Sequence, residues 1–377
     1  MSEQTTRREF LKDTGLVAGA IGVLNPMQAL AEAQTRATIK YPDGGAEHCI
    51  FIWLGGGAAQ IDMWDPKRVG DPKAKNAGSA YPAIDTAIPG VQVTEHLGQC
   101  AKILDRFCLL RTVNHDTKDE HAAATNRMHT GRPVSGTIVY PSIGSIVANQ
   151  RGKVTKGMPA YVVMGYPNLT RGPGFLGAQD GYIYLIDTEA GPSGLRRPSG
   201  ISDTRQTRRE QLLSGLRSGF RQRTSTDPAV KNYDSVIEEA FALGRGEFMN
   251  AFQLANESSG LRESYGGEFG QRCLLARRLV QRGVRFIEVS FNLNFINGTG
   301  WDTHNEGQEK QHILIRQLDQ ALASLVLDLE KHKLFDKTLV VVATEFGRPA
   351  QFDDGGGRGH HSGSFSVVTA GGGLKNG

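Results

Sequence analysis

The residues best suited to chemistry are acids and histidines that directly follow runs expected to form buried strands. One residue, Thr344, separates Glu345 from the run Thr338–Ala343, and Asp302 and His304 follow the run Val284–Phe291. A carboxylate at the end of a buried strand is costly unless it is paired or ligated. An aspartate and a histidine two residues apart on a loop can face one cation together. These residues predict a cation site of nitrogen and oxygen ligands, with zinc the first expectation.

A second group of candidates follows the strand-like run Phe107–Arg111. It contains three histidines within fifteen residues, an unusual density: His115, His121 and His129. His360 and His361 form a further pair before the last apolar run. Parallel strands bring such loops to one edge of a sheet, where ligands of α/β proteins bind. The alternative interpretation of these histidines is a solvated surface loop.

A glycine-rich turn, Gly55–Gly57, follows the run Cys49–Leu54, and Asp62 comes shortly afterwards. Three glycines let the backbone approach a ligand closely. Their spacing is not that of a dinucleotide-binding turn, and no helix clearly opens at them. We therefore take Asp62 as a candidate that adds a metal ligand or orients one.

Short apolar runs that do not alternate must position these loops. They are rich in β-branched and aromatic residues, as strands buried on both faces are. The runs are Cys49–Leu54, Phe107–Arg111, Tyr161–Met164, Val284–Phe291, Thr338–Ala343 and Phe365–Ala370. Two helical stripes lie between them, from Phe269 to Val280 and from Leu314 to Leu329. Strands alternating with helices predict an α/β protein whose parallel sheet is covered on both faces.

The segment from about residue 168 to 226 differs in composition, being rich in Gly, Pro and Arg. Six arginines between Arg205 and Arg223 fall on a predicted helix. We expect an excursion from the core that carries a basic surface. A solvated helix face explains this surface better than an anion-binding patch.

The N-terminus carries an export signature. Arg7 and Arg8 precede Phe10–Lys12 in the twin-arginine pattern. An apolar stretch too short to span a bilayer follows, and Ala29–Ala31 fits a cleavage site. Residues 1–31 therefore predict a twin-arginine signal peptide and a periplasmic or secreted protein, exported folded. A chance arginine pair before an amphipathic helix is the alternative.

Composition excludes several other classes of protein. The net charge of +4 is a mild bias and gives no nucleic-acid signature. Beyond the signal, no apolar run approaches the length of a transmembrane helix, so no membrane span is expected. Four cysteines in 377 residues do not make a disulfide scaffold. Twin-arginine substrates often load a cofactor before export, which agrees with a metal site.

Several strings of the chain resemble, in the right order, the family called domain of unknown function 1501. They include GGGAAQIDMWDPK, HTGRPVSGTIVYPSIGS, YGGEFGQRCLLARRLVQRGVRFIEV, GWDTH and TLVVVATEFGR. The resemblance runs from about His48 to the last residue. Family members are typically exported by the twin-arginine route and belong to the alkaline phosphatase and sulfatase superfamily. The resemblance implies an alkaline-phosphatase-like domain over residues 45–377, a three-layer α/β/α sandwich with a mostly parallel central sheet.

The superfamily's nucleophile matches this chain poorly. It is Ser, Thr or a modified Cys, and it usually lies nine residues before the Thr of a Thr-Gly pair. Counted back from Thr130-Gly131, that place holds His121. Thr125 lies nearby in a different register. The usual sulfatase mechanism, which starts from Cys or Ser, is therefore not expected.

The superfamily's metal ligands also match in part. The place of its first metal aspartate is glycine here, and an Asp-His pair becomes Glu345-Phe346, which loses one histidine. His360 matches the final metal histidine. One divalent cation is therefore expected rather than two. Its expected ligands are Asp62, Asp302, His304, Glu345 and His360.

Our first hypothesis is a metal-dependent hydrolase of phosphate or sulfate esters, borne by small molecules or polysaccharides, in the periplasm. The cation would act as a Lewis acid and lower the pKa of a bound water. His121 would be a ligand, a general acid–base or a covalent acceptor. Arg348 or Arg358 would hold the anion, with a structural ion pair as the alternative.

The second hypothesis is a non-catalytic protein on a degenerate hydrolase fold. The missing nucleophile is compatible with an anion-binding, glycan-binding or partner protein, because fold does not settle function.

The chain also stops at Gly371–Gly377, directly after an expected strand and without a closing helix. Members of the family usually continue further, so we expect a truncated C-terminus.

Export is expected to depend on the arginine pair. Changing Arg7 and Arg8 together to Lys should leave the protein in the cytoplasm with its signal uncleaved, because the export machinery reads this pair. Cell fractionation and the mass of the N-terminal fragment measure both effects. Normal periplasmic delivery of the double variant would contradict the signal assignment.

Overall fold

The computed structural model describes residues 44–374, apart from residues 156, 197–199, 225–226, 246 and 305–306. Residues Gly45–Gly377 group as one unit. The signal peptide expected at residues 1–31 lies outside the described residues. None of the described helices is long and apolar enough to cross a membrane.

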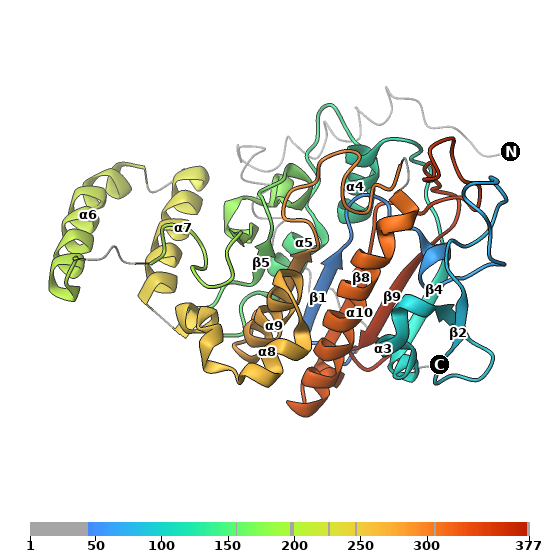
Figure 1. The fold of residues 1–377 in the computed structure, drawn as a ribbon. Coiled ribbons are helices and arrows are strands. Elements are labelled where there is room, and N and C mark those ends of the chain that lie inside the picture. Colours follow the sequence, from blue (N-terminus) through green and yellow to red (C-terminus); the bar gives the residue numbers. More distant parts are fainter. Residues whose placement is uncertain are drawn as a thin grey trace, which may run out of the picture. The chain divides into compact units, whose positions relative to one another are not determined.

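A seven-stranded sheet in the order β4-β9-β8-β1-β7-β5-β6 forms the centre of this unit (Figure 1). Its strands are β1 (His48–Trp53), β4 (Phe107–Val113), β5 (Tyr161–Met164), β6 (Ile183–Leu185), β7 (Phe286–Ser290), β8 (Thr338–Ala343) and β9 (Phe365–Gly371). Pairing is parallel except at β9, which runs antiparallel to both β4 and β8. The mostly parallel sheet expected from the sequence is confirmed, and all six expected strands are present.

Strand β1 shows why the sheet needs helices on both faces. Ile50 and Ile52 are fully buried and pack with the apolar residues of α9 and α10. Phe51 and Trp53 point to the opposite face, where they form a second cluster with residues of α4 and α5. Because successive side chains of a strand alternate between faces, a strand that is apolar throughout must be covered twice. The result is a three-layer α/β/α arrangement.

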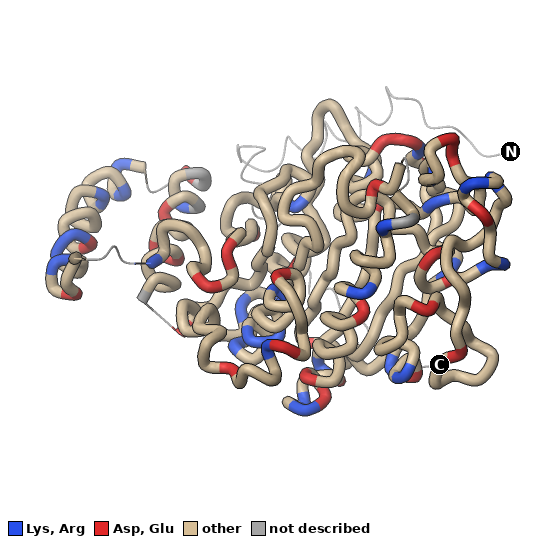
Figure 2. The backbone as a smooth tube through the Cα atoms, viewed as in Figure 1, with Lys and Arg blue, Asp and Glu red and all other residues tan. Residues whose placement is uncertain are grey.

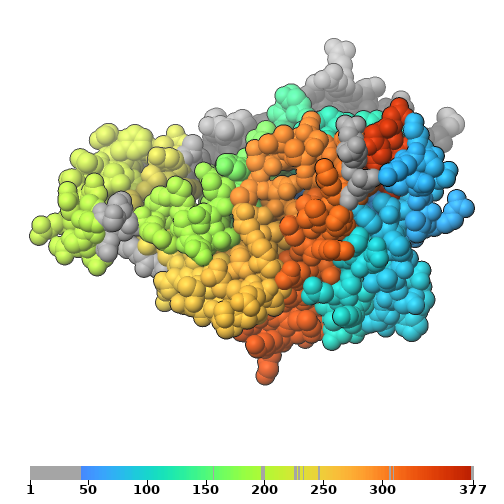
Figure 3. All heavy atoms as spheres, in the orientation of Figure 1, coloured from blue at the N-terminus to red at the C-terminus, as the bar shows by residue number. Residues whose placement is uncertain are grey.

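The helices are short except for three. Their bounds are α3 (Gly98–Ala101), α4 (His121–Thr130), α5 (Ile143–Arg151), α6 (Asp203–Arg223), α7 (Pro228–Arg245), α8 (Ser259–Tyr265), α9 (Glu268–Gln281) and α10 (Gly307–Lys331). In the space-filling view α10 covers the middle of the visible face (Figure 3). The helical stripes expected from Phe269 to Val280 and from Leu314 to Leu329 are confirmed as α9 and α10. Gly283 takes a φ of +90° just after α9, a conformation that favours glycine.

The segment from about residue 168 to 226 is only partly an excursion from the core. Strand β6 lies within it and forms the edge of the central sheet beside β5. The arginine-rich helix expected here is present as α6, and Figure 2 shows several Lys and Arg positions along its backbone. Arg217 and Arg221 of α6 pair with Asp234 of α7, so part of this charge is neutralised.

A separate antiparallel hairpin joins β2 (Ala83–Asp85) and β3 (Gln92–Thr94).

The sheet brings the loops that carry the candidate residues to one edge. Strands β1, β4, β7 and β8 run in the same direction, so the loops after them meet at the carboxyl edge. Because β9 runs antiparallel to β8, the connection from β8 to β9 starts and ends at this edge. The histidines expected before the last strand are thereby placed beside residues that follow the other strands.

Candidate metal centre at the carboxyl edge of the sheet

Asp302 is the centre of a histidine cluster at this edge. Its Oδ1 lies 3.3 Å from Nε2 of His121, 3.1 Å from Nε2 of His304 and 3.6 Å from Nε2 of His360. The ligand atoms of His121, Asp302 and His360 all lie within 4.8 Å of one another. Ligands at zinc–nitrogen distances around a tetrahedral ion are separated by roughly 3.4 Å. These three side chains are thus spaced as one small cation requires.

His304 closes the cluster on its exposed side. Its Nε2 lies 3.3 Å from Nε2 of His360, and its side chain is 35% exposed. A guanidinium nitrogen of Arg348 lies 3.4 Å from the same Nε2. The ligand atoms that all lie within 4.8 Å of one another are those of His121, Asp302 and His360, so these three residues form the candidate ligand set.

Glu345 lies behind His121 and not among the atoms that face the candidate ion. Its Oε1 lies 2.7 Å from Nδ1 of His121 and accepts a hydrogen bond from the backbone of Gly56 at 2.8 Å. A carboxylate in this position fixes the ring and directs the other nitrogen outward, as it does behind metal-bound histidines. The expectation that Glu345 ligates the ion is therefore replaced by a positioning role.

His121 needs a positive partner at its second nitrogen, or a proton. Its buried Nε2 has no hydrogen bond of good geometry among the described residues, although Asp302 lies 3.3 Å away. Burial by itself lowers the pKa of His121, but the flanking carboxylates of Asp302 and Glu345 outweigh burial and raise that pKa to about 9. A divalent cation at Nε2 would supply the same positive charge.

Asp302 is held ionised by its surroundings. Burial opposes the charge, but His121, His360, the amide of Gly298 and Arg348 hold the pKa of Asp302 well below its usual range. The Gly298 amide donates to Oδ2 at 2.6 Å, which leaves Oδ1 facing the histidines. The carboxylate is thus oriented and charged, as a metal ligand must be.

The guanidinium group of Arg348 uses its hydrogen-bond donors within the protein. Its buried guanidinium donates to Asp302 at 2.5 Å and to the carbonyl oxygens of Gly56, Gly57 and Arg358 at 2.5, 2.8 and 2.7 Å. Few donors remain for a substrate anion. Arg348 therefore positions Asp302, and the structure gives no support to the expected role of holding the anion.

Asp62 and Arg358 form an ion pair with each other, away from the cluster. Both distances between the guanidinium and the carboxylate oxygens are 2.9 Å, and both side chains are fully buried. Ala80 and Gln308 donate to the remaining lone pairs of Asp62. These contacts leave Asp62 unable to ligate the ion and Arg358 unable to bind an anion. Both expectations are corrected, and the structural ion pair is the right interpretation.

Of the other two expected histidines, His115 is half-buried on the loop between β4 and α4, and His129 lies in α4. Nε2 of His115 lies 2.5 Å from the carbonyl oxygen of Glu345, so it supports the loop after β8. His129 is buried in α4, and its Nε2 lies 3.3 Å from Glu288.

Glu288 is a buried charge that sequence reasoning missed. It lies in the middle of β7, with Arg171 and His129 paired to it and the hydroxyl of Tyr161 at 3.3 Å. Burial opposes its ionisation, but Arg171 and His129 lower the pKa of Glu288 to about 2. A glutamate inside the apolar run Phe286–Ser290 was the signal that could have revealed this network.

A polar cavity of about 310 Å³ adjoins the cluster through His121. It lies between the start of α4, the loop after β5 and the loop after β7. Its lining includes Trp53, Glu120, His121, Thr125, Tyr166, Asn168, Thr170, Arg171, Asn292, Asn294, Phe295, Asn297 and Glu345.

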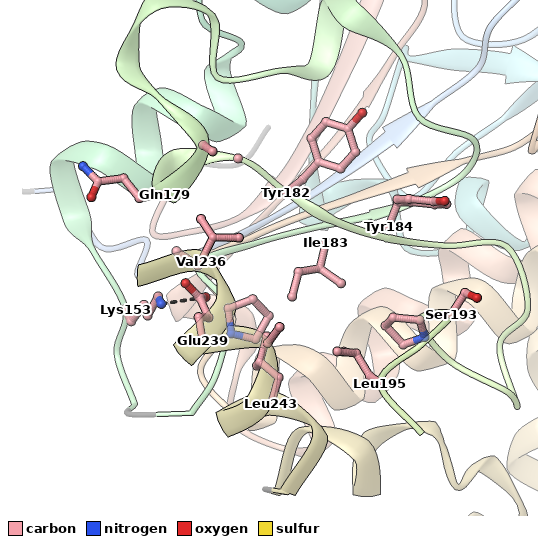
Figure 4. Close-up of a pocket in the computed structure, with 16 residues that line it drawn as sticks. Lys153, Gln179, Tyr182, Ile183, Tyr184, Ser193, Leu195, Val236, Glu239 and Leu243 are labelled. Carbon is pink, nitrogen blue, oxygen red and sulfur yellow. Dashed lines mark ion pairs between the residues drawn. The ribbon is translucent and has the colours of Figure 1, made fainter. Parts of the chain in front are cut away.

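A second cavity, of about 280 Å³, lies between β6 and α7 (Figure 4). Ile183, Val236 and Leu243 form much of its apolar wall, and an ion pair of 2.6 Å joins Lys153 and Glu239 beside it. None of its lining residues belongs to the histidine cluster.

Solved structures with a similar arrangement come from phosphatases and sulfatases. An alkaline phosphatase mutant from the Antarctic bacterium TAB5 is 12% identical, with a TM-score of 0.37, over 87% of this chain and 92% of that one. A lipoteichoic acid synthase of Listeria monocytogenes is 9% identical, with a TM-score of 0.37, over 88% and 67%. A sulfatase of Pseudoalteromonas sp. is 10% identical, with a TM-score of 0.37, over 88% and 63%. Similarity at this level carries no information on activity.

The chain belongs to the family described as protein of unknown function DUF1501, whose model matches residues 46–377. The family resemblance expected from the sequence motifs is thereby confirmed. No curated protein sequence matches the chain.

The buried ion pair gives a stability prediction. Asp62→Asn should lower the free energy of unfolding by about 3–5 kcal/mol, because it leaves the Arg358 guanidinium buried without a counter-charge. Urea unfolding measures this difference. Lys75→Met is the matched control, since it breaks a pair that is open to solvent, Lys75 with Asp354, and should leave the midpoint unchanged. A loss below about 1 kcal/mol for Asp62→Asn would show that the pair is dispensable.

Proposed function

We propose that this protein is a metal-dependent hydrolase of phosphate or sulfate esters. The observation that carries the proposal is the convergence of His121, His304 and His360 on one carboxylate oxygen of Asp302, beside a polar cavity. Imidazole and carboxylate ligands suit zinc, which we propose as the ion. When bound, it would act as a Lewis acid on an oxygen of the ester.

The chain's own residues prepare the site for this chemistry. Glu345 holds Nδ1 of His121, so Nε2 is the nitrogen available to the ion. Arg348 and the amide of Gly298 hold the carboxylate of Asp302 in place. Groups fixed before the substrate arrives need no reorganisation during the reaction, which is how preorganised sites lower a barrier.

His121 best serves as a ligand. Nδ1 is bonded to Glu345 and the ion would occupy Nε2, so with the ion bound neither nitrogen would be free to accept a phosphoryl group or to take a proton from water. The nucleophile is then a water drawn from the adjoining cavity. We also propose that the protein acts in the periplasm, on the strength of the twin-arginine pattern in residues 1–31.

A non-catalytic role is the second candidate. It is favoured by the absence of Ser, Thr or Cys from the position that His121 occupies at the start of α4. In that case the same residues would bind an anion or a glycan without turnover. Assays of turnover separate the two functions, whereas metal content does not.

Metal binding is tested through His360. His360→Ala should lose the bound ion and melt at a lower temperature, because an ion that binds only the folded state stabilises it, by about 2.7 kcal/mol when free metal is 100 times its Kd. Elemental analysis and thermal unfolding in added zinc measure both effects. His361→Ala is the matched control, since this exposed neighbour lies outside the cluster. Equal zinc content in the wild type and in His360→Ala would refute the site.

Catalysis is tested through His121. His121→Ala should lower turnover of aryl phosphates or aryl sulfates by roughly 100-fold or more, because removing a proposed metal ligand should cost at least as much as the 10- to 100-fold lost when only its supporting partner is removed. The screen covers phosphate monoesters, phosphate diesters and sulfate esters, each with zinc restored, and His361→Ala again serves as control. If the wild type turns over none of them above the His121→Ala background, the binding function replaces the hydrolase.

A further inference from the structure

The residues that line the cavity beside His121 differ from those expected of a site that binds only a small ion. Four asparagines surround it, contributed by the loops after β5 and β7: Asn168, Asn292, Asn294 and Asn297. Trp53, Tyr166 and Phe295 supply aromatic rings to the same lining. Arg171 is the one cationic side chain among the described lining residues apart from His121, and Glu288 neutralises it. The lining therefore favours a group that is uncharged and polar.

The asparagine amides are free to bind such a group. No hydrogen bond joins the side chains of Asn294 or Asn297 to other described residues, and both residues are exposed, whereas Nδ2 of Asn292 is closed off from solvent. The Oδ1 of Asn168 accepts from Thr170, which leaves its own amide hydrogens available. Each amide offers donors and an acceptor at once, the combination that a hydroxyl group needs, whereas Lys offers donors only and a carboxylate acceptors only.

The aromatic rings complete the match to a sugar. The ring of Phe295 packs against His121 with centroids 4.8 Å apart, so it joins the cavity to the cluster. Tyr166 is 47% exposed beside the same cavity. The C–H faces of a sugar ring are apolar while its rim carries hydroxyls. A cavity that combines apolar rings with a few placed polar groups orients such a ligand.

We propose that this cavity binds the sugar part of a carbohydrate ester, with the phosphate or sulfate group directed to the histidine cluster. The inference rests on the proposed hydrolase function for the position of the ester group. Sugar binding itself depends only on the cavity. A volume of about 310 Å³ matches the lower range of small-ligand sites, so one or two sugar rings are the expected size.

The test compares sugar esters with aryl esters. Glucose 6-phosphate and galactose 6-sulfate are assayed against p-nitrophenyl phosphate and p-nitrophenyl sulfate, with zinc present. Asn294→Ala and Asn297→Ala should each lower the ratio of kcat/KM for the sugar ester to that for the aryl ester by roughly twofold to tenfold, the value of one hydrogen bond. Both residues are exposed, so the variants should fold. Tyr184→Ala, in the cavity beside β6, is the control and should leave the ratio unchanged.

Binding of uncharged sugars separates this inference from the proposed function. Saturation-transfer NMR with the methyl glycosides of glucose, galactose and mannose should show binding that Asn294→Ala weakens. Glycoside binding without any ester turnover would remove the hydrolase and leave the sugar site. Turnover of aryl esters, with no glycoside binding and no change of ratio in the asparagine variants, would remove the sugar site and leave the hydrolase.

Discussion

The guanidinium of Arg348 joins the parts of this site. A cation removed from water must find an acceptor for its donors, or its burial would unfold the surrounding structure. Arg348 finds them in the loop after β1, at Gly56 and Gly57, in the loop before β9, at the carbonyl of Arg358, and in Asp302 after β7. The loops are therefore fixed relative to one another before any ligand enters. Gly56 permits this closeness, since it has a φ of +124° and a Cβ there would lie 2.5 Å from the backbone nitrogen of Asp302.

Much of the fold and part of the site followed from the order of residues along the chain. Unbroken apolar runs predicted the buried strands. Because the loops at the carboxyl ends of parallel strands meet at one edge of a sheet, the sequence also predicted that Asp302, His304 and His360 lie close together. The direction in which each side chain points could not be predicted from the sequence. Nothing in the sequence says that Asp62, on a short turn, faces inward to Arg358, or that Glu345 reaches the far nitrogen of His121. The ion itself and the export route remain predictions.

Two features of the sheet could not be predicted from the sequence either. One is the reversed direction of β9, and the other is the short strand β6. An apolar run predicts burial but does not say which way the strand points, and three residues, Ile183–Leu185, are too few for a pattern.

Glu288 shows how tertiary contacts override local preference. The desolvation cost of an isolated carboxylate argues against one in a central strand, yet Arg171 and His129, from a turn and a helix earlier in the chain, offset that cost.

Strand β9 has a consequence for the order of assembly. It comes last among the described strands, yet it lies between β4 and β8, and β4 joins the sheet only through it. During synthesis, the chain around β4 must wait for residues 365–371 before it has a place in the sheet, and pairing over such separations is slow. His121 follows β4 and His360 precedes β9, so they too come together only at this late step. An ion held between them would bind only after β9 has docked between β4 and β8, and its presence would report that this docking has taken place.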